Sequence, residues 1–200
     1  MDFYIPLPKI ASENNFVYPG MINSFNRYLL LIIAFSLMIN FSSKAQGSKK
    51  SLEVGDMMPA FSLKDQDGNT FNSADHIGKS MMVIYFYPKD ESMVCTKEAC
   101  AFRDDFDDFT KAGAKVIGIN GGTVASHKAF EQHYKLPFTL LSDPGDKVYK
   151  LFGVKGSLFF TGRKTFVIDL HGKIVYTHDA LLEGRAHADE SLKYITAAHK

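Results

Sequence analysis

The sequence of 200 residues has only two cysteines, and both lie in the stretch DESMVCTKEAC, from Asp90 to Cys100. A disulfide between them would close a very small loop, so it would stabilise the fold less than a bridge between distant segments. This excludes a cysteine framework as the main source of stability. The pair is therefore predicted to have a chemical role.

An excess of charge of one sign is also missing, because 23 Lys and Arg residues balance 22 Asp and Glu residues. Without a basic face or an arginine-rich arm, the sequence excludes the electrostatic footprint of a nucleic-acid-binding protein and favours a neutral or small substrate. The seven histidines form neither an H-E-x-x-H motif nor a Cys/His cluster with metal spacing. His127 and His133 are interpreted as surface or structural groups, and no metal or other cofactor is expected.

Long hydrophobic runs are scarce. The run Tyr28–Phe41 is shorter than the roughly 17 to 25 apolar residues of a membrane helix. It follows Arg27 and precedes small residues that fit a cleavage site, which predicts a secretory signal peptide in an N-terminal leader of residues 1–45. Translation from Met21 would give a more compact leader. The prediction is export to the bacterial periplasm, with tethering by an uncleaved leader as the less favoured alternative.

After a polar linker at residues 46–52, the pattern of the chain alternates between strands and helices over residues 53–200. FSLKDQDGNTF predicts two short strands around Asp67-Gly68, and the continuous apolar run Met81–Tyr87 predicts a strand buried on both faces. Further strands are predicted at 115–119, 138–141, 165–169 and 173–177, and helices at 93–111, 125–134, 143–152 and 186–199. The fold class is therefore α/β, with a central mixed β-sheet flanked by helices.

The N-terminus of the helix predicted at 93–111 contains the first cysteine. Ser92 is suited to the N-cap, so Cys95 becomes the third helical residue, where free N–H groups and the helix dipole favour an anion. Because the thiolate is the nucleophilic form of cysteine, this position predicts a reactive Cys95. The alternative is an inert buried thiol, since Cys95 lies in line with the apolar stripe Phe102, Phe106 and Phe109.

The second cysteine lies five helical positions further on. Five steps rotate Cys100 by about 140° from Cys95 and place their Cα atoms roughly 8 to 9 Å apart. A disulfide tolerates at most about 7 Å. The two thiols therefore cannot join while the helix is intact, but can join if its first turns unwind, which suits one thiol that reacts and another that resolves it.

The segment YFYPKDESMVCTKEACAFRDDF resembles the active-site segment of peroxiredoxins, in particular the peroxiredoxin Q or bacterioferritin comigratory protein branch. The similarity extends over nearly all of residues 53–200. It implies a thioredoxin-like fold and a thiol-dependent peroxidase that reduces hydrogen peroxide and organic hydroperoxides, with a thioredoxin-like protein as reductant. It also favours a monomer, although dimers occur in the wider family.

The resemblance assigns roles to individual residues. Pro88, Ser92 and Cys95 match the family signature Pro-x-x-x-Thr/Ser-x-x-Cys, which implies that Cys95 is the peroxidatic cysteine and that the Ser92 hydroxyl orients the peroxide. It further implies that Arg163 faces the thiolate and that Glu98 helps to hold this arginine.

Cys100 matches the position at which this branch often carries its resolving cysteine, which implies an intrachain disulfide. The chain departs from the family pattern in having Met93-Val94 where Pro-Gly is common and Ser92 where Thr is usual. The apolar residues 158–160 are predicted to form a collar around the site, a docking surface or part of the core.

Two other functions fit a thioredoxin-like fold. An envelope thiol-disulfide oxidoreductase typically uses C-x-x-C, and a copper-delivery module uses C-x-x-x-C. The spacing here is C-x-x-x-x-C, and Arg163 near two thiolates would oppose a metal cation.

Overall fold

The structure is a computed structural model that describes residues 50–156 and 162–198. The predicted leader, most of the linker and the apolar residues 158–160 lie outside the described residues. Among the residues that are described, no helix has the length and apolar character needed to cross a membrane.

The described strands form one mixed sheet in the order β2-β1-β5-β4-β3-β6-β7. The central pairs β3–β4 and β4–β5 are parallel, whereas β6 and β7 on one side and β1 and β2 on the other pair antiparallel. The strands are β1 (Ser62–Asp65), β2 (Thr70–Asn72), β3 (Met81–Phe86), β4 (Ala114–Asn120), β5 (Thr139–Ser142), β6 (Lys164–Ile168) and β7 (Ile174–His178). The predicted mixed sheet is confirmed.

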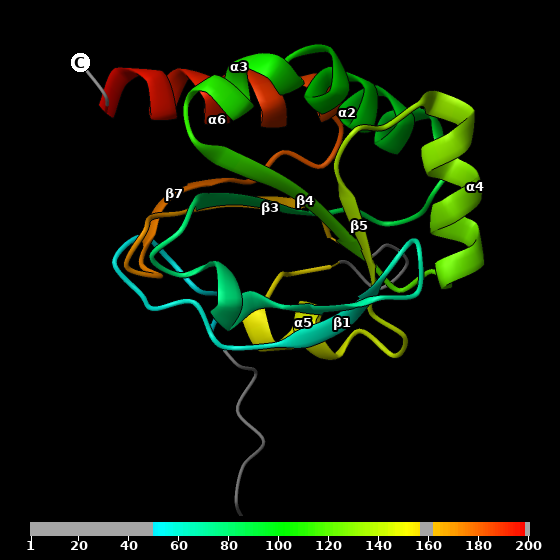
Figure 1. The fold of residues 1–200 in the computed structure, drawn as a ribbon, viewed down its shortest axis with the longest axis horizontal. Helices are drawn as coiled ribbons and strands as arrows, with labels where there is room; N and C mark the ends of the chain where they lie inside the picture. The colour runs from blue at the N-terminus through cyan, green and yellow to red at the C-terminus, as the bar shows by residue number, and fades with distance from the viewer. Residues whose placement is uncertain (1–49, 157–161, 199–200) are drawn as a thin grey trace, which may run out of the picture. The chain divides into compact units, whose positions relative to one another are not determined.

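Helices cover both faces of this sheet (Figure 1). They are α2 (Met93–Asp104), α3 (Phe106–Lys111), α4 (Val124–Tyr134), α5 (Lys147–Phe152) and α6 (Gly184–Ala198), with a 3-10 turn η1 (Ser73–His76). The helices α2, α3 and α6 lie on one face, α5 lies on the opposite face, and α4 runs along the side of the sheet next to β5.

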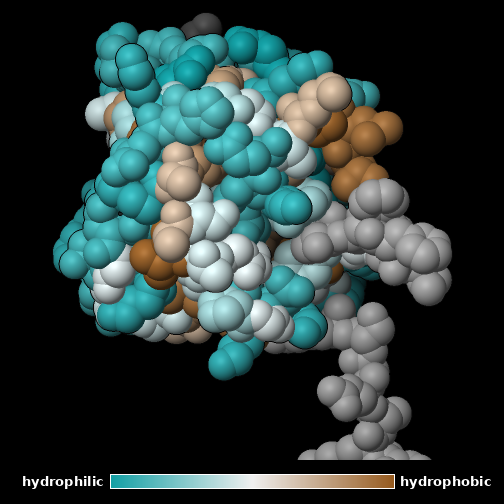
Figure 2. Space-filling view, turned by 90° about the vertical axis from the view of Figure 1, so that its right-hand side faces the viewer, coloured by the Kyte–Doolittle hydropathy of each residue, from teal (hydrophilic) through white to brown (hydrophobic). Residues whose placement is uncertain are grey.

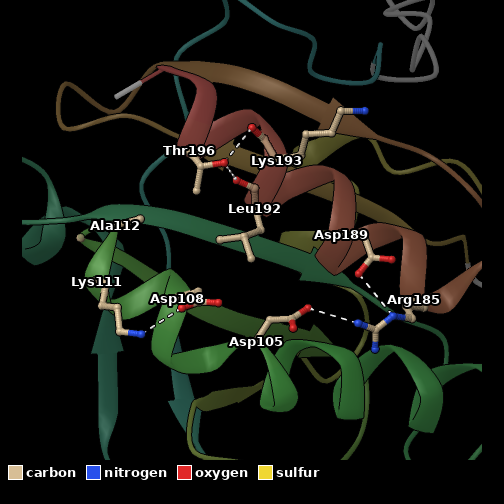
Figure 3. Close-up of a pocket in the computed structure, with 10 residues that line it drawn as sticks. Asp105, Asp108, Lys111, Ala112, Arg185, Asp189, Leu192, Lys193 and Thr196 are labelled. Atoms are coloured by element: carbon tan, nitrogen blue, oxygen red, sulfur yellow. Dashed lines mark hydrogen bonds and ion pairs between the residues drawn. The ribbon is translucent and has the colours of Figure 1, made fainter. Parts of the chain in front are cut away.

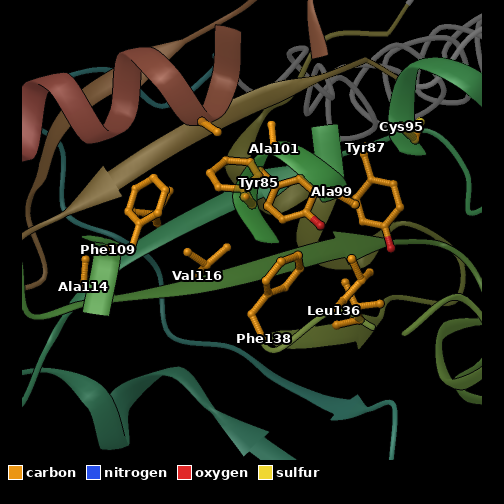
Figure 4. Packing of buried hydrophobic residues seen from close by; sticks show 14 of the residues in the cluster. Tyr85, Tyr87, Cys95, Ala99, Ala101, Phe109, Ala114, Val116, Leu136 and Phe138 are labelled. Carbon is orange, nitrogen blue, oxygen red and sulfur yellow. The ribbon is translucent and has the colours of Figure 1, made fainter. Parts of the chain in front are cut away.

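The central strand β3 is buried on both faces, as predicted. Its side chains alternate, so Val83 and Tyr85 belong to the core under α2 and α6, whereas Ile84 and Phe86 belong to the core against α5. Figure 4 shows the first of these cores, in which the Tyr85 ring stacks on Phe102 with 4.6 Å between ring centroids. This contact fixes α2 on the sheet.

The helix predicted at 93–111 is divided in two. Asp105 leaves the helical backbone conformation with φ −99° and ψ 10°, which ends α2 and starts α3. The apolar pattern hides this break because Phe102 and Phe109 stay fully buried on the same side.

Two details of the other helices also differ from the prediction. The helix predicted at 143–152 begins only at Lys147, because residues 143–146 form a turn. From this turn the Asp143 carboxylate accepts hydrogen bonds from the N–H groups of Lys147, Val148 and Tyr149. The last helix, predicted from residue 186, begins two residues earlier, at Gly184. The face of α6 that is buried contains His187, Ala188, Ser191 and Ile195.

Candidate active site

The N-terminus of α2 lies just after the central strand. Ser92 occupies the N-cap with extended φ −78° and ψ 146°, and its carbonyl accepts a hydrogen bond from Thr96 N–H at 2.8 Å. Cys95 is therefore the third residue of the helix, as predicted. The Ser92 hydroxyl does not cap the helix in the expected way, since it donates to the carbonyl of Lys89 at 3.2 Å. Pro88 lies between β3 and this turn and is partly exposed.

Arg163 reaches the first cysteine from the sheet. It immediately precedes β6, and the register of β6 against β3 pairs Thr165 with Tyr85. Because side chains alternate along a strand, Arg163 points to the same face as Thr165, towards α2. Its Nη2 lies 3.2 Å from the Sγ of Cys95. Arg163 and Cys95 are only 3% and 1% exposed, so the guanidinium acts on the thiol in a site with little water.

Glu98 holds this arginine in place. It lies one turn after Cys95 on α2, is fully buried, and forms an ion pair with Nη1 of Arg163 through its Oε2 atom. The Arg163 Nε atom donates to the carbonyl of Leu181 at 3.1 Å. A buried guanidinium needs such partners because its desolvation is costly. The structure thus brings together Cys95, Glu98 and Arg163, as the resemblance implied.

His187 is a further residue of this site, and no sequence pattern indicated it. Its Nε2 faces the Ala180 carbonyl at 2.9 Å, and its Nδ1 lies 2.8 Å from the Thr165 hydroxyl. Burial lowers the pKa of His187 to about 4, and the charges of His178 and Arg163 act in the same direction. The hydrogen bond to the Ala180 carbonyl opposes this shift but is outweighed. The ring is therefore neutral at pH 7, with its single proton on Nε2.

This tautomer affects the neighbouring carboxylate. The Nδ1 atom of His187 lies 3.6 Å from Oε1 of Glu98, but it carries a lone pair and accepts from Thr165. Within the part of the chain that the structure describes, Glu98 Oε1 has no hydrogen-bond partner. Arg163 is therefore the partner of this carboxylate, through its other oxygen, Oε2.

The second cysteine lies on the same intact helix. Cys100 is partly buried, and both cysteines are free thiols. Helix α6 packs closely on the first turn of α2, since a Cβ added to Gly184 would lie only 2.5 Å from the carbonyl oxygen of Val94. Unwinding of this turn would have to break the contact with Gly184.

The surface has other features away from this cluster. Figure 3 shows a groove between α3 and α6, where Arg185 forms ion pairs with Asp105 at 3.7 Å and Asp189 at 3.4 Å. The groove contains none of the predicted site residues. The face of the molecule in Figure 2 is mostly hydrophilic, with hydrophobic residues in a few small patches. Met93, the first residue of α2, and Leu182, just before α6, are 76% and 78% exposed.

Comparisons with known proteins identify the family of this chain. The AhpC/TSA family matches residues 54–177. The chloroplastic peroxiredoxin Q of Suaeda salsa is 51% identical over 143 residues, which are 70% of this chain and 66% of that protein. The chloroplastic peroxiredoxin Q of Arabidopsis thaliana is 43% identical over 194 residues, which are 96% of this chain and 85% of that protein.

Solved structures give the same result. The peroxidoxin BcpB of Mycobacterium tuberculosis has a TM-score of 0.69 and 33% identity, over 73% of this chain and 97% of that one. The peroxiredoxin Q of Xanthomonas campestris has a TM-score of 0.65 and 30% identity, over 70% of this chain and 92% of that one. The thioredoxin-like fold is confirmed.

The chain belongs to the AhpC/TSA family. Within this family it is a peroxiredoxin of the peroxiredoxin Q branch, as the active-site segment predicted. The matched part of the chain spans about two thirds of the length of some of these relatives.

The predicted localisation is wrong. These curated relatives are chloroplastic proteins, which contradicts the predicted bacterial periplasm. An apolar run before small residues marks a targeting segment, but these features alone do not determine the compartment.

Proposed function

We propose that this chain is a thiol peroxidase that reduces hydrogen peroxide and organic hydroperoxides through Cys95. The observation that carries the proposal is the position of the Cys95 sulfur. It lies in the first turn of α2 and 3.2 Å from the buried guanidinium of Arg163. The helix terminus and the arginine both place positive charge near this sulfur, and the nucleophilic form of cysteine is the thiolate.

In the first step, the Cys95 thiolate attacks one oxygen of the peroxide and the O–O bond breaks. The sulfur is oxidised to a sulfenic acid, while the peroxide is reduced and leaves as water or an alcohol after it takes up a proton. Arg163 and the Cys95 N–H would stabilise the charge on the oxygens. The Ser92 hydroxyl donates to the Lys89 carbonyl, and its free lone pairs would accept a hydrogen bond from the peroxide and so orient it.

In the second step, the Cys100 sulfur attacks the sulfenic sulfur, the S–O bond breaks and water leaves. The product is an intrachain disulfide between Cys95 and Cys100, and it requires that the first turns of α2 unwind. A thioredoxin-like protein dithiol would reduce this disulfide by exchange and be oxidised in turn. We expect the enzyme to work as a monomer.

Peroxide consumption with a thioredoxin-type reductant tests both steps. Cys95→Ser should abolish turnover. Cys100→Ser should allow one oxidation of Cys95 and then stall unless a small monothiol is supplied. Turnover of Cys95→Ser at the rate of the unsubstituted protein would refute the peroxidase assignment, and mass mapping that never finds the two cysteines joined would refute the role of Cys100.

The rival function, exchange with protein disulfides, is tested by an insulin-reduction assay on the same preparation. The structure favours the peroxidase, because the intact helix keeps Cys100 from joining Cys95 directly. Rapid insulin reduction without peroxide consumption would favour the rival.

A further inference from the structure

The loop between β3 and α2 contains a buried carboxylate that the proposed chemistry does not use. Asp90 is 5% exposed, and four side chains donate to it. Its Oδ1 accepts from the hydroxyl of Tyr87 at 2.8 Å and the amide of Asn120 at 2.9 Å. Its Oδ2 accepts from the hydroxyl of Ser126 at 2.5 Å and lies 2.8 Å from Nδ1 of His127. These partners come from the end of β3, the end of β4 and the first turn of α4.

The carboxylate is charged in this network. Burial opposes ionisation, but the hydrogen bonds from His127 and Ser126 outweigh it and hold the pKa of Asp90 below its ordinary value. His127 is fully buried, and its other ring nitrogen, Nε2, faces the carbonyl of Leu141 at 3.2 Å. A buried, multiply bonded carboxylate of this kind tolerates little displacement.

The next residue of the loop is also tied to α4. Glu91 has a left-handed backbone with φ 60°, which is unusual for a residue other than glycine. Its carboxylate lies 3.1 Å from Nδ1 of His133, near the C-terminal end of α4. A strained backbone persists only where its surroundings fix it. Two consecutive residues are thus held by α4 immediately before Ser92, where α2 begins.

We infer that Asp90 is a positioning residue for the peroxidase reaction, because its attachment to α4 fixes the point at which α2 begins and so keeps Cys95 beside Arg163. This inference rests on the proposed function. Arg163 is held separately, just before β6, so a movement of the loop relative to the sheet changes the distance between the guanidinium and the sulfur. A misplacement of about 1 Å in an active site can lower a rate on the order of a hundredfold.

The same attachment limits the unwinding. If the loop stays on α4 after oxidation, α2 unwinds only beyond Ser92.

The test compares two buried aspartates. Asp90→Asn removes the charge that holds the loop. Asp143→Asn is the matched control, since Asp143 is 1% exposed and accepts three backbone hydrogen bonds, but caps α5. Both changes are made in a Cys100→Ser background, and sulfenic acid at Cys95 is trapped with dimedone in quenched-flow experiments and measured by mass spectrometry. Chemical denaturation gives the stability of each variant.

The rate constant of Cys95 oxidation should fall roughly tenfold to a hundredfold in Asp90→Asn and stay within about twofold of the reference in Asp143→Asn, although both variants lose stability. A folded Asp90→Asn protein that reacts at the reference rate, or an equal loss in Asp143→Asn, overturns the inference. A reference protein that does not react with peroxide at all overturns the proposed function instead.

A milder pair of variants covers the case in which Asp90→Asn does not fold. Ser126 is exposed, so Ser126→Ala should fold while it removes one donor to Asp90. It should slow Cys95 oxidation by a smaller factor, and Ser126→Thr, which keeps the hydroxyl, should restore the rate. A rate equal to the reference in Ser126→Ala would overturn the inference in that case.

Discussion

Arg163 places its Nη2 atom 3.2 Å from the Sγ of Cys95, although 68 residues separate the two in the chain. The arginine comes from the sheet and the cysteine from a helix that packs on it. The environment of the thiol therefore depends on how α2 sits on the sheet as well as on the helix itself.

Replacement of Arg163 should slow the chemical step. Arg163→Lys keeps a charge but loses the planar fork that contacts Cys95 and Glu98 together. Loss of one such stabilising group typically costs about 10²- to 10³-fold in rate, so Cys95 oxidation should fall within that range in rapid-mixing experiments. Arg185→Lys, at an exposed arginine of α6, is the control and should react normally. Equal rates for the two variants would contradict the assigned role of Arg163.

His187 should make the protein sensitive to mild acid. Its pKa is about 4 in the folded protein and about 6.5 in an unfolded chain, so between these values only the unfolded state binds the proton. The stability that the neutral His187 ring contributes is complete above about pH 6.5. It is lost as pH falls towards 4, by up to about 1.4 kcal/mol per pH unit. Between pH 7 and 4, the slope of the free energy of unfolding against pH, measured with denaturant, should be smaller for His187→Gln than for the unsubstituted protein. The exposed control His171→Gln should keep the original slope, and a His187→Gln slope as steep as that of the unsubstituted protein would exclude this residue as the cause.

The contact between α2 and the sheet can be tested through its aromatic core. Phe102 is fully buried against Tyr85, so Phe102→Ala should lower the free energy of unfolding by roughly 3–5 kcal/mol. Phe106 follows the break at Asp105 and is only partly buried, so Phe106→Ala should cost clearly less. Similar losses in urea denaturation would mean that Phe102 does not anchor α2 more than its neighbour does.

Oxidation should loosen a limited segment. In the protein with a Cys95–Cys100 disulfide, amide hydrogen exchange should increase within residues 93–102 and stay unchanged in the loop 87–92 and in α4. This follows because Asp90 and Glu91 remain attached to α4 while the first turns unwind. Increased exchange throughout the loop or α4 would show that their attachment breaks during resolution.

Local patterns in the sequence predict much of the fold. The central strand β3 follows from an unbroken apolar run, and the position of Cys95 in α2 follows from a cap residue three positions before it. Both depend on residues close together in the chain. The break at Asp105 was missed for the same reason, because the apolar stripe continues across it.

Long-range contacts in the site leave no such local pattern. Arg163 and Glu98 were identified through the family resemblance, since nothing in the periodicity connects two residues on different elements. Neither the local patterns nor the family resemblance indicated His187 or the partners of Asp90. Their role comes from hydrogen bonds between side chains that only the packing of α4, α6 and the sheet brings together.

The close approach of Gly184 to Val94 suggests a practical use. A methyl group at position 184 would push the first turn of α2 away from α6, since it would lie only 2.5 Å from the carbonyl oxygen of Val94. The lifetime of the sulfenic acid could thus be tuned from a neighbouring helix, with every residue that touches the peroxide left unaltered.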